Sequence, residues 1–255
     1  MRDDMVQITL ITIDNYGPWT HKLGNDREHK LQMYQASLFE TIQNMFSVRG
    51  GLVFSNRFDE FFAISDGISY SMHLEIKTKL QELFPFEISM AIANSKSPYL
   101  ANKEAFVAQS ALNCKNSISA AVRKDAIDER VYLIHLDIEG ITQMRMKTTP
   151  FDITMLVQAT HQIISHYCYE NKLLGFFMGG DNFVIVSDDS PKIHSRNLTS
   201  MIQKNLGIVV NCGIGEEKTA RIAMAIATKN LDEIRKLRGS GQDFPRILDG
   251  KTITN

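Results

Sequence analysis

The sequence has few cysteines, and none of them are paired at a metal-binding spacing. Its three cysteines, Cys114, Cys168 and Cys212, are odd in number and lie far apart. This pattern argues against a disulfide framework and against a structural zinc site, whose thiolates normally come in closely spaced pairs. Isolated thiols suit a reducing compartment, so we expect a cytoplasmic protein.

Long apolar runs and an excess of one charge are also missing. No apolar stretch approaches the roughly 20 residues that cross a bilayer, and the opening residues MRDDMVQITL lack the apolar segment of a signal peptide. The formal net charge is −1, with Lys and Arg scattered along the chain. We therefore expect neither a membrane nor a nucleic acid as a partner. The 255 residues are enough for one large domain or two small ones.

What the sequence does contain is an internal repeat. LVFSNRFDEFFAISD (52–66) matches LGFFMGGDNFVIVSD (174–188) without a gap, and six of the fifteen positions are identical. This match places Asp59 over Asp181. A repeat of this length indicates duplication when other segments follow it in the same order.

Two further matches occur at nearly the same offset. ITLITIDNYG (8–17) lies over VYLIHLDIEG (131–140), which places Asp14 over Asp137, and residues 90–105 lie over residues 212–227. Three matches in one order favour a duplicated domain.

Each half has the same expected order of elements. The apolar periodicity predicts strands at 8–14 and 131–137, a helix at about 152–170, hairpins at 52–66 and 174–188, helices at about 70–83 and 192–205, and strands at 86–93 and 208–214. With a final helix, this is the β-α-β-β-α-β order of ferredoxin-like domains. We expect an α+β fold of two tandem repeats, residues 1–111 and 130–255, joined by a polar connector at 112–129.

Two carboxylates should meet in the second repeat. The end of the first strand and the tip of the hairpin lie at one edge of such a sheet, so Asp137 and Asp181 should be neighbours. Close carboxylates repel one another and usually hold a cation, and their oxygens suit Mg²⁺ bridging to phosphates. Gly179 and Gly180 would let a ligand approach the backbone closely.

Groups that could bind phosphate lie near these carboxylates in the sequence. The backbone N–H groups of Gly140, Ile141 and Thr142 follow the first strand and could hold phosphate oxygens. Lys218 and Arg235 lie in or near the last helix and could reach a triphosphate. The alternative for each basic residue is a solvated helix face.

The motifs HLDIEGIT (135–142) and FFMGGDNF (176–183) resemble the palm of nucleotidyl cyclases, a fold shared by class III adenylyl cyclases, GGDEF diguanylate cyclases and many polymerases. The resemblance implies that Asp137, the carbonyl of Ile138 and Asp181 hold two Mg²⁺ ions on a nucleoside triphosphate. We group Asn182 with the two aspartates as a catalytic residue.

Over nearly the whole chain, IDNYGPWT (13–20), GGLVFSNRFDEFFAI (50–64) and GIGEEKTA (213–220) are also similar to archaeal GTP cyclohydrolase III. That family is implied to hydrolyse GTP with Mg²⁺ and to open the imidazole ring while keeping the formyl group. The implied products are 2-amino-5-formylamino-6-(5-phosphoribosylamino)pyrimidin-4(3H)-one and two phosphates, which feed flavin and deazaflavin synthesis. The family resemblance and the paired domains also favour a homo-oligomer.

The sequence departs from the cyclase pattern in both halves. Asn182 stands where diguanylate cyclases have a carboxylate, which weakens a prediction of cyclic-di-GMP synthesis. Arg57 stands in the first half where the second has Gly179, although Asp14 and Asp59 leave a second metal site open. The remaining alternatives for the function are a guanylate or diguanylate cyclase and a protein that senses GTP without turning it over. A monovalent cation such as K⁺ could be an additional cofactor.

The sequence does not identify the residues that bind the guanine base or those that transfer protons. Asn15, Tyr16 and Trp19 could contact guanine, and the alternative is that they form a packed turn. His135 should share a sheet face with Asp137, either as an acid-base group or as a histidine that only supports the carboxylates. No zinc-binding constellation is present for the ring opening.

Overall fold

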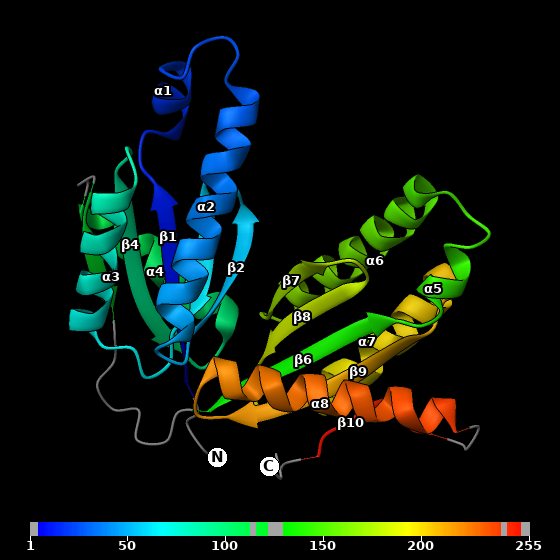
Figure 1. The fold of residues 1–255 in the computed structure, drawn as a ribbon. Coiled ribbons are helices and arrows are strands. Elements are labelled where there is room, and N and C mark those ends of the chain that lie inside the picture. The colour runs from blue at the N-terminus through cyan, green and yellow to red at the C-terminus, as the bar shows by residue number, and fades with distance from the viewer. Residues whose placement is uncertain (1–4, 113–115, 122–129, 241–243, 251–255) are drawn as a thin grey trace. The chain divides into compact units, whose positions relative to one another are not determined.

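The computed structural model describes residues 5–112, 116–121, 130–240 and 244–250. It separates into two compact units. Nearly all described residues up to Ala121 belong to the first, and nearly all from Arg130 onward belong to the second. Each unit is built on one five-stranded sheet (Figure 1). The predicted α+β fold with two ferredoxin-like repeats is confirmed. None of the helices in the described ranges is long and apolar enough to cross a membrane.

The first unit contains β1 (Val6–Ile13), α1 (Tyr16–His21), α2 (Glu28–Ser47), β2 (Leu52–Arg57), β3 (Glu60–Ile64), α3 (Tyr70–Leu83), β4 (Ile88–Ser95), α4 (Pro98–Leu112) and β5 (Ile118–Ala121). The second contains β6 (Val131–Ile138), α5 (Ile141–Met144), α6 (Pro150–Glu170), β7 (Leu174–Gly179), β8 (Asn182–Ser187), α7 (Pro191–Leu206), β9 (Val210–Glu217), α8 (Ala220–Gly239) and β10 (Ile247–Leu248). The strand orders are β2-β3-β1-β4-β5 and β10-β9-β6-β8-β7.

Both sheets have a short edge strand that the sequence did not predict. In the first sheet this is β5, which lies within the stretch predicted as a connector and pairs in parallel with β4. In the second it is β10, which pairs in parallel with β9. Residues 113–115 and 122–129 of the predicted connector, including Cys114, lie outside the described residues.

The long helix of the second unit begins where its capping residues require. Thr149 and Asp152 form a reciprocal capping box, and Pro150 occupies the first turn, where the missing N–H costs nothing. From there α6 runs to Glu170 as one helix. Its N-terminal turns lie next to the tip of the β7–β8 hairpin, since residues from both line the same pocket.

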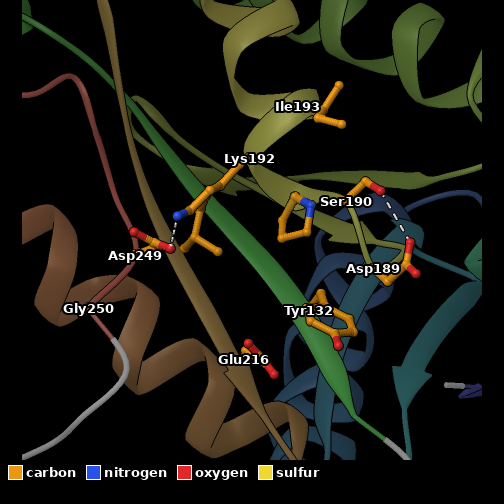
Figure 2. A pocket seen from close by; sticks show the side chains of 10 residues that line it. Tyr132, Asp189, Ser190, Lys192, Ile193, Glu216, Asp249 and Gly250 are labelled. Carbon is orange, nitrogen blue, oxygen red and sulfur yellow. Dashed lines mark hydrogen bonds and ion pairs between the residues drawn. The ribbon is translucent and has the colours of Figure 1, made fainter. Parts of the chain in front are cut away.

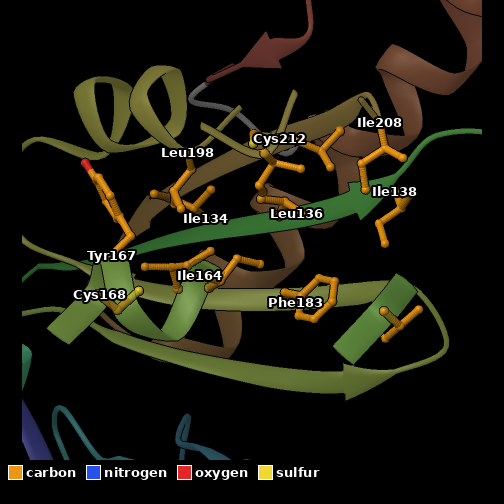
Figure 3. Close-up of a cluster of buried hydrophobic side chains, with 14 of the residues drawn as sticks. Ile134, Leu136, Ile138, Ile164, Tyr167, Cys168, Phe183, Leu198, Ile208 and Cys212 are labelled. Atoms are coloured by element: carbon orange, nitrogen blue, oxygen red, sulfur yellow. The ribbon is translucent and has the colours of Figure 1, made fainter. Parts of the chain in front are cut away.

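The two faces of the second sheet carry different chemistry. On β6, the alternating residues Ile134, Leu136 and Ile138 pack with α6 and α7 in a buried apolar cluster (Figure 3). The residues between them, His135 and Asp137, face α8 on the other side, as the two-residue period of a strand requires. The fold therefore separates an apolar face from a face with ionisable groups.

The pairing of strands confirms the duplication in detail. In the first unit Leu52 pairs with Ile64 and Arg57 with Glu60. Adding the sequence offset of the hairpin match gives the observed pairs Leu174 with Val186 and Gly179 with Asn182. Even the irregularity in register falls at the same place in both hairpins.

The first strands, in contrast, align differently from our sequence match. Thr12 pairs with Glu60 just as Asp137 pairs with Asn182, so the counterpart of Asp137 is Thr12. The N–H of Asp14 bonds to Glu87 as that of Glu139 bonds to Val209. Our alignment of Asp14 with Asp137 is therefore wrong. The reason is length: 39 positions separate Ile13 from Leu52, but 36 separate Ile138 from Leu174, a difference that an ungapped match cannot show.

Substitution of Gly215 by alanine should strongly destabilise the second unit. The Cβ that alanine would add lies 1.8 Å from the carbonyl oxygen of Ala223, so α8 would have to move off β9. Overpacking of this kind costs about 3 kcal/mol, and urea unfolding measures it.

The matched control is Gly239→Ala at the end of the same helix. No atom lies within 4 Å of the added Cβ there, so this change should be neutral or stabilise by up to about 1 kcal/mol. Equal stability of the two variants would show that α8 does not pack closely on β9.

Candidate active site at one end of the second sheet

The predicted neighbours Asp137 and Asp181 are brought together by the pairing of β6 with β8. Asp137 lies opposite Asn182, one position from Asp181, and the N–H of Ile138 donates to the backbone oxygen of Asp181 at 3.3 Å. The Asp137 side chain is buried, with the residue 6% exposed, whereas Asp181 is half-buried at the hairpin tip. The sheet thus fixes both carboxylates before any ligand binds.

Burial is the main influence on Asp137. It raises the pKa of this carboxyl group, Arg235 opposes the shift, and the charge of Asp181 adds to it. Arg235 on α8 donates to Asp137 at 2.9 Å and also pairs with Asp232 at 2.8 Å. The structure therefore places Arg235, predicted as a phosphate-binding residue, beside Asp137, whose charge its guanidinium partly neutralises.

A second charged group surrounds Glu139, which the sequence analysis did not select. Asn211 and Arg246 both donate to its carboxylate, and Arg238 lies 3.5 Å from it. Although burial acts in the opposite direction, these hydrogen bonds and positive charges hold the pKa of Glu139 below its usual value. Arg246 is more than 100 residues from Glu139 in the chain, so no local pattern pointed to it.

Asn182 and His135 hold the carboxylate of Asp181 in a chain of hydrogen bonds. Asn182 Nδ2 donates to Asp181 Oδ1 at 3.1 Å, because an ionised carboxylate can only accept. The other atom of the Asn182 amide, Oδ1, lies 2.9 Å from His135 Nε2. Because an amide oxygen can only accept, Nε2 is the ring nitrogen that carries the proton. Nδ1 therefore accepts from Thr228 Oγ1 at 3.2 Å. Burial lowers the pKa of His135, and this histidine supports Asp181 from below the surface.

The donor set at this end of the sheet suits Mg²⁺. Asp137, Asp181 and the Ile138 carbonyl offer oxygen atoms, and the described part of the chain has no cluster of three or more His, Cys, Asp or Glu side chains arranged for a metal ion. A Mg²⁺ ion commonly takes one or two carboxylates and completes its shell with water and substrate phosphates. The residues present therefore fit the ion that the sequence implies.

The turn after β6 has the local geometry that its glycine permits. Gly140 has a φ of 81° and precedes the short α5, whose first N–H groups receive no side-chain cap. Gly179 and Gly180 at the hairpin tip also have positive φ values, of 103° and 62°, which residues with a Cβ rarely adopt. Both turns expose backbone next to the carboxylates.

A pocket of about 630 Å³ opens beside Asp181. Its size falls within the range of small-molecule sites. The wall contains two rings, His161 and Phe177, and two neutral polar side chains, Thr154 and Gln158. The remaining lining residues are Ile141, Arg145, Pro150, Ile153, Val157, Gly180 and Asp181.

This pocket was not predicted from the sequence, although one pattern in α6 is consistent with it. Thr154, Gln158 and His161 are spaced by four and three residues, which places them on one face of α6. Because most helices that pack on a sheet have a polar face, this stripe indicates a cavity wall only once the surface that it faces is known.

A different pocket, of about 350 Å³, lies near the opposite end of the second sheet (Figure 2). Its charged side chains have partners: Lys192 pairs with Asp249, and Glu216 pairs with Arg130. Among its described lining residues, this smaller pocket has no pair of neighbouring carboxylates comparable to Asp137 and Asp181. We therefore place the active site at the hairpin tip.

Lys218 does not join this site within the second unit. It follows Glu217, which pairs with Val131, whereas Asp137 pairs with Asn211. At about 3.3 Å per residue of strand, Lys218 lies roughly 20 Å along the sheet from Asp137. The prediction that Lys218 reaches the same phosphates is wrong for this unit, because the antiparallel β9 carries it to the opposite end.

The acidic residues of the first unit have other partners. Asp14 Oδ2 accepts hydrogen bonds from Ser89 Oγ at 2.6 Å and from the N–H of Asn116 at 2.7 Å. Asp59 forms an ion pair with Arg57 at 3.3 Å. The guanidinium of Arg57 thus stands where the second unit has Gly179. This argues against a second metal site at Asp14 and Asp59, the alternative that the sequence had left open.

The three residues suggested for guanine contacts belong to a turn in the first unit. Trp19 is 9% exposed and packs edge-on against Tyr34 and Phe86. Tyr16 accepts a hydrogen bond from Gln35 at 2.7 Å. Asn15 has a φ of 52° and precedes α1. This packing supports the alternative of a packed turn.

Comparisons with known proteins place the chain in a family. The family model described as GTP cyclohydrolase III matches residues 5–244. The chain is 34% identical to GTP cyclohydrolase III of Methanococcus vannielii over 241 residues, covering 91% of this chain and 90% of that protein. It is 32% identical to GTP cyclohydrolase III of Methanothermobacter thermautotrophicus over 239 residues, covering 91% and 95%.

Among solved structures, two similar chains come from cyclases. The GGEEF domain of a diguanylate cyclase from Vibrio cholerae is 12% identical, with a TM-score of 0.37, over 49% of this chain and 85% of that one. A bacterial light-regulated adenylyl cyclase is 10% identical, with a TM-score of 0.39, over 91% and 83%. Scores this low carry no weight for function.

Arg235→Gln should destabilise the metal-free protein and make it more responsive to Mg²⁺. The change removes the guanidinium that pairs with the buried Asp137 carboxylate, which then faces Asp181 without a positive partner. This should lower the free energy of unfolding by on the order of 2 kcal/mol at pH 7. The cost is below that of a fully buried pair, because the Arg235 side chain is 38% exposed. Urea unfolding with and without Mg²⁺ measures both effects.

The pH dependence gives an independent check. The pKa of Asp137 is already raised in the folded state, so its charging opposes folding as the pH rises through that pKa, and the penalty of Arg235→Gln should disappear in acid. Lys236→Gln, an exposed neighbour paired with Glu233, is the control and should change stability by under about 0.5 kcal/mol. A penalty that persists when Asp137 is protonated would contradict this account.

Proposed function

The chain belongs to the GTP cyclohydrolase III family, and we propose that it hydrolyses GTP with Mg²⁺ to 2-amino-5-formylamino-6-(5-phosphoribosylamino)pyrimidin-4(3H)-one and two phosphates. Membership makes it an enzyme of the GTP cyclohydrolase type. The finer proposal is supported by the carboxylate pair Asp137 and Asp181 at the end of β6 and β8, because Asp181 also lines a pocket large enough for a nucleotide. The product would supply flavin and deazaflavin synthesis.

The proposed substrate lies across the hairpin tip, with its base in the pocket and its phosphates at the carboxylates. Phe177 and His161 offer ring faces to a purine, and Gln158 offers both a donor and an acceptor to its polar edge. The triphosphate then reaches Gly140 and the backbone of Ile141 and Thr142.

Positive charge is available for the phosphates from two directions. Arg145 lines the pocket on one side, and Arg235 contacts Asp137 on the other. When a cation occupies the carboxylates, Arg235 no longer has to neutralise Asp137, and its guanidinium can turn to a phosphate oxygen in bidentate fashion.

Each residue of the site has a defined part in this reaction. Asp137, Asp181 and the Ile138 carbonyl would hold Mg²⁺, which supplies charge neutralisation at the phosphates when bound. The chain Asn182–His135–Thr228 keeps Asp181 in one orientation, so less reorganisation is needed when the substrate arrives. The pocket wall positions C8 of the purine for attack by water, with one water consumed for each bond cleaved.

Asp181→Asn should reduce GTP turnover by more than about 100-fold, since even residues that only support metal ligands cost 10–100-fold when removed. Asp59→Asn is the matched control, because Asp59 occupies the same place in the first hairpin and should leave turnover within about twofold of wild type. Mass spectrometry of the nucleotide and a phosphate assay report the result.

The same assay on the wild-type protein separates the alternatives. A formyl-retaining monophosphate with two phosphates per turnover supports the proposal. Cyclic GMP or cyclic-di-GMP with pyrophosphate would instead assign a cyclase, and bound GTP without any product would assign a sensor. Full activity of a folded Asp181→Asn variant would refute the role of the carboxylate pair.

A further inference from the structure

Opening the imidazole ring requires a group that takes protons from oxygen and gives them to nitrogen. Imidazole side chains can do both, and the second unit contains four histidines. Two of them have both ring nitrogens engaged. His135 bonds to Asn182 and Thr228 and is 8% exposed. His194 bonds to Tyr167 and Asp188. His166 is largely exposed and pairs with Glu170.

His161 is the fourth histidine, and its environment differs from the other three. Its ring lines the pocket beside Asp181 and stacks on Phe183, with centroids 5.9 Å apart and an interplanar angle of 27°. Phe177 contacts it at 6.0 Å. Within the described ranges, no hydrogen bond or ion pair engages its ring nitrogens, so both are available to a ligand in the pocket.

The duplicated half shows that packing does not require an imidazole at this position. At the offset that relates the two hairpins, His161 corresponds to Phe39 and Phe183 to Phe61, and Phe39 and Phe61 also stack, with centroids 6.1 Å apart and an angle of 17°. The same ring contact is therefore built from two phenyl groups in the first unit. What His161 adds to the second unit is an imidazole, with its two ring nitrogens, in the wall of the pocket.

We propose that His161 is the catalytic acid-base residue that opens the purine ring at C8. The proposal rests on the proposed function, since it assigns a residue to the ring-opening step of that reaction. It also answers the question that the sequence left open between His135 and an unnamed group.

His161 would act twice in this step, once for each proton that moves from oxygen to nitrogen. Water forms a bond to C8 while neutral His161 takes one of its protons and the C8–N7 π pair moves to N7, which then receives that proton. His161 next takes the proton of the C8 hydroxyl as the C8–N9 bond breaks and its electron pair goes to N9. The imidazolium returns the proton to N9, which leaves a formyl group on N7 and a neutral histidine.

The surroundings of His161 favour its neutral form at the start of this cycle. Burial lowers its pKa, and the charged side chains that share its pocket are Arg145 and Asp181, of opposite sign. The other rings packed against it, Phe177 and Phe183, carry no charge. Ring opening should accordingly decline as the pH falls through the pKa of His161.

The test compares His161→Phe and His161→Gln with wild type in GTP and Mg²⁺. Formation of the formyl product, followed by mass spectrometry, should fall at least about 100-fold in both variants, as expected for loss of a general acid-base group. Binding of GTP to His161→Phe should stay within about threefold of wild type, because the ring contact seen at Phe39 and Phe61 remains. His166→Gln, an exposed histidine on the same helix, is the control and should behave as wild type.

A small-molecule rescue separates chemistry from packing. Added imidazole should restore ring opening to His161→Ala in proportion to its unprotonated fraction, and should not affect His161→Phe, whose ring fills the space. Ring opening within tenfold of wild type in His161→Gln, or a parallel tenfold loss of GTP affinity in the folded His161→Phe protein, would overturn the assignment. A wild-type protein that never opens the ring would refute the proposed function instead.

Discussion

The antiparallel pairing of β6 with β8 is the constraint on which the site depends. It places Asp137 opposite Asn182 and next to Asp181, although two carboxylates have no electrostatic reason to approach each other. The free energy that holds them comes from the other face of the sheet, where the apolar cluster of α6 and α7 packs. Arg235 offsets part of the cost in the metal-free protein, and the remaining strain favours any cation that arrives with the substrate.

The sequence could predict the elements because each has a strong local signal. The helix at Tyr70–Leu83 and the hairpin strands begin and end close to their predicted limits, and the duplication predicts both sheets at once. It could not predict how the two first strands correspond, because the extra residues before the first hairpin shift Asp14 onto the position of Glu139. A similarity between short motifs therefore aligned Asp59 with Asp181 correctly but aligned Asp14 with the wrong residue of the second half.

The parts of the site that the sequence did not yield depend on long-range packing. Arg246 reaches Glu139 only because β10 adds to the edge of the sheet beside β9. The pocket forms where α6 passes the hairpin tip, so its wall combines Gln158 with Phe177 from different elements. Only the polar stripe on α6 was visible in advance, and a stripe has no meaning until the surface that it faces is known.

The duplicated chain separates what the fold needs from what the chemistry needs. The first unit keeps the strand order, the hairpin register and the stacked ring pair. At the equivalent positions it has Thr12 for Asp137, Arg57 for Gly179 and Phe39 for His161, so it lacks the strand carboxylate, the open hairpin tip and the imidazole. Because the same fold stands without all three, none of them is required for packing in the second unit. Of the three, His161 lines the pocket that Gly180 and Asp181 also border, and this arrangement is the one expected of a site that combines phosphate binding with proton transfer.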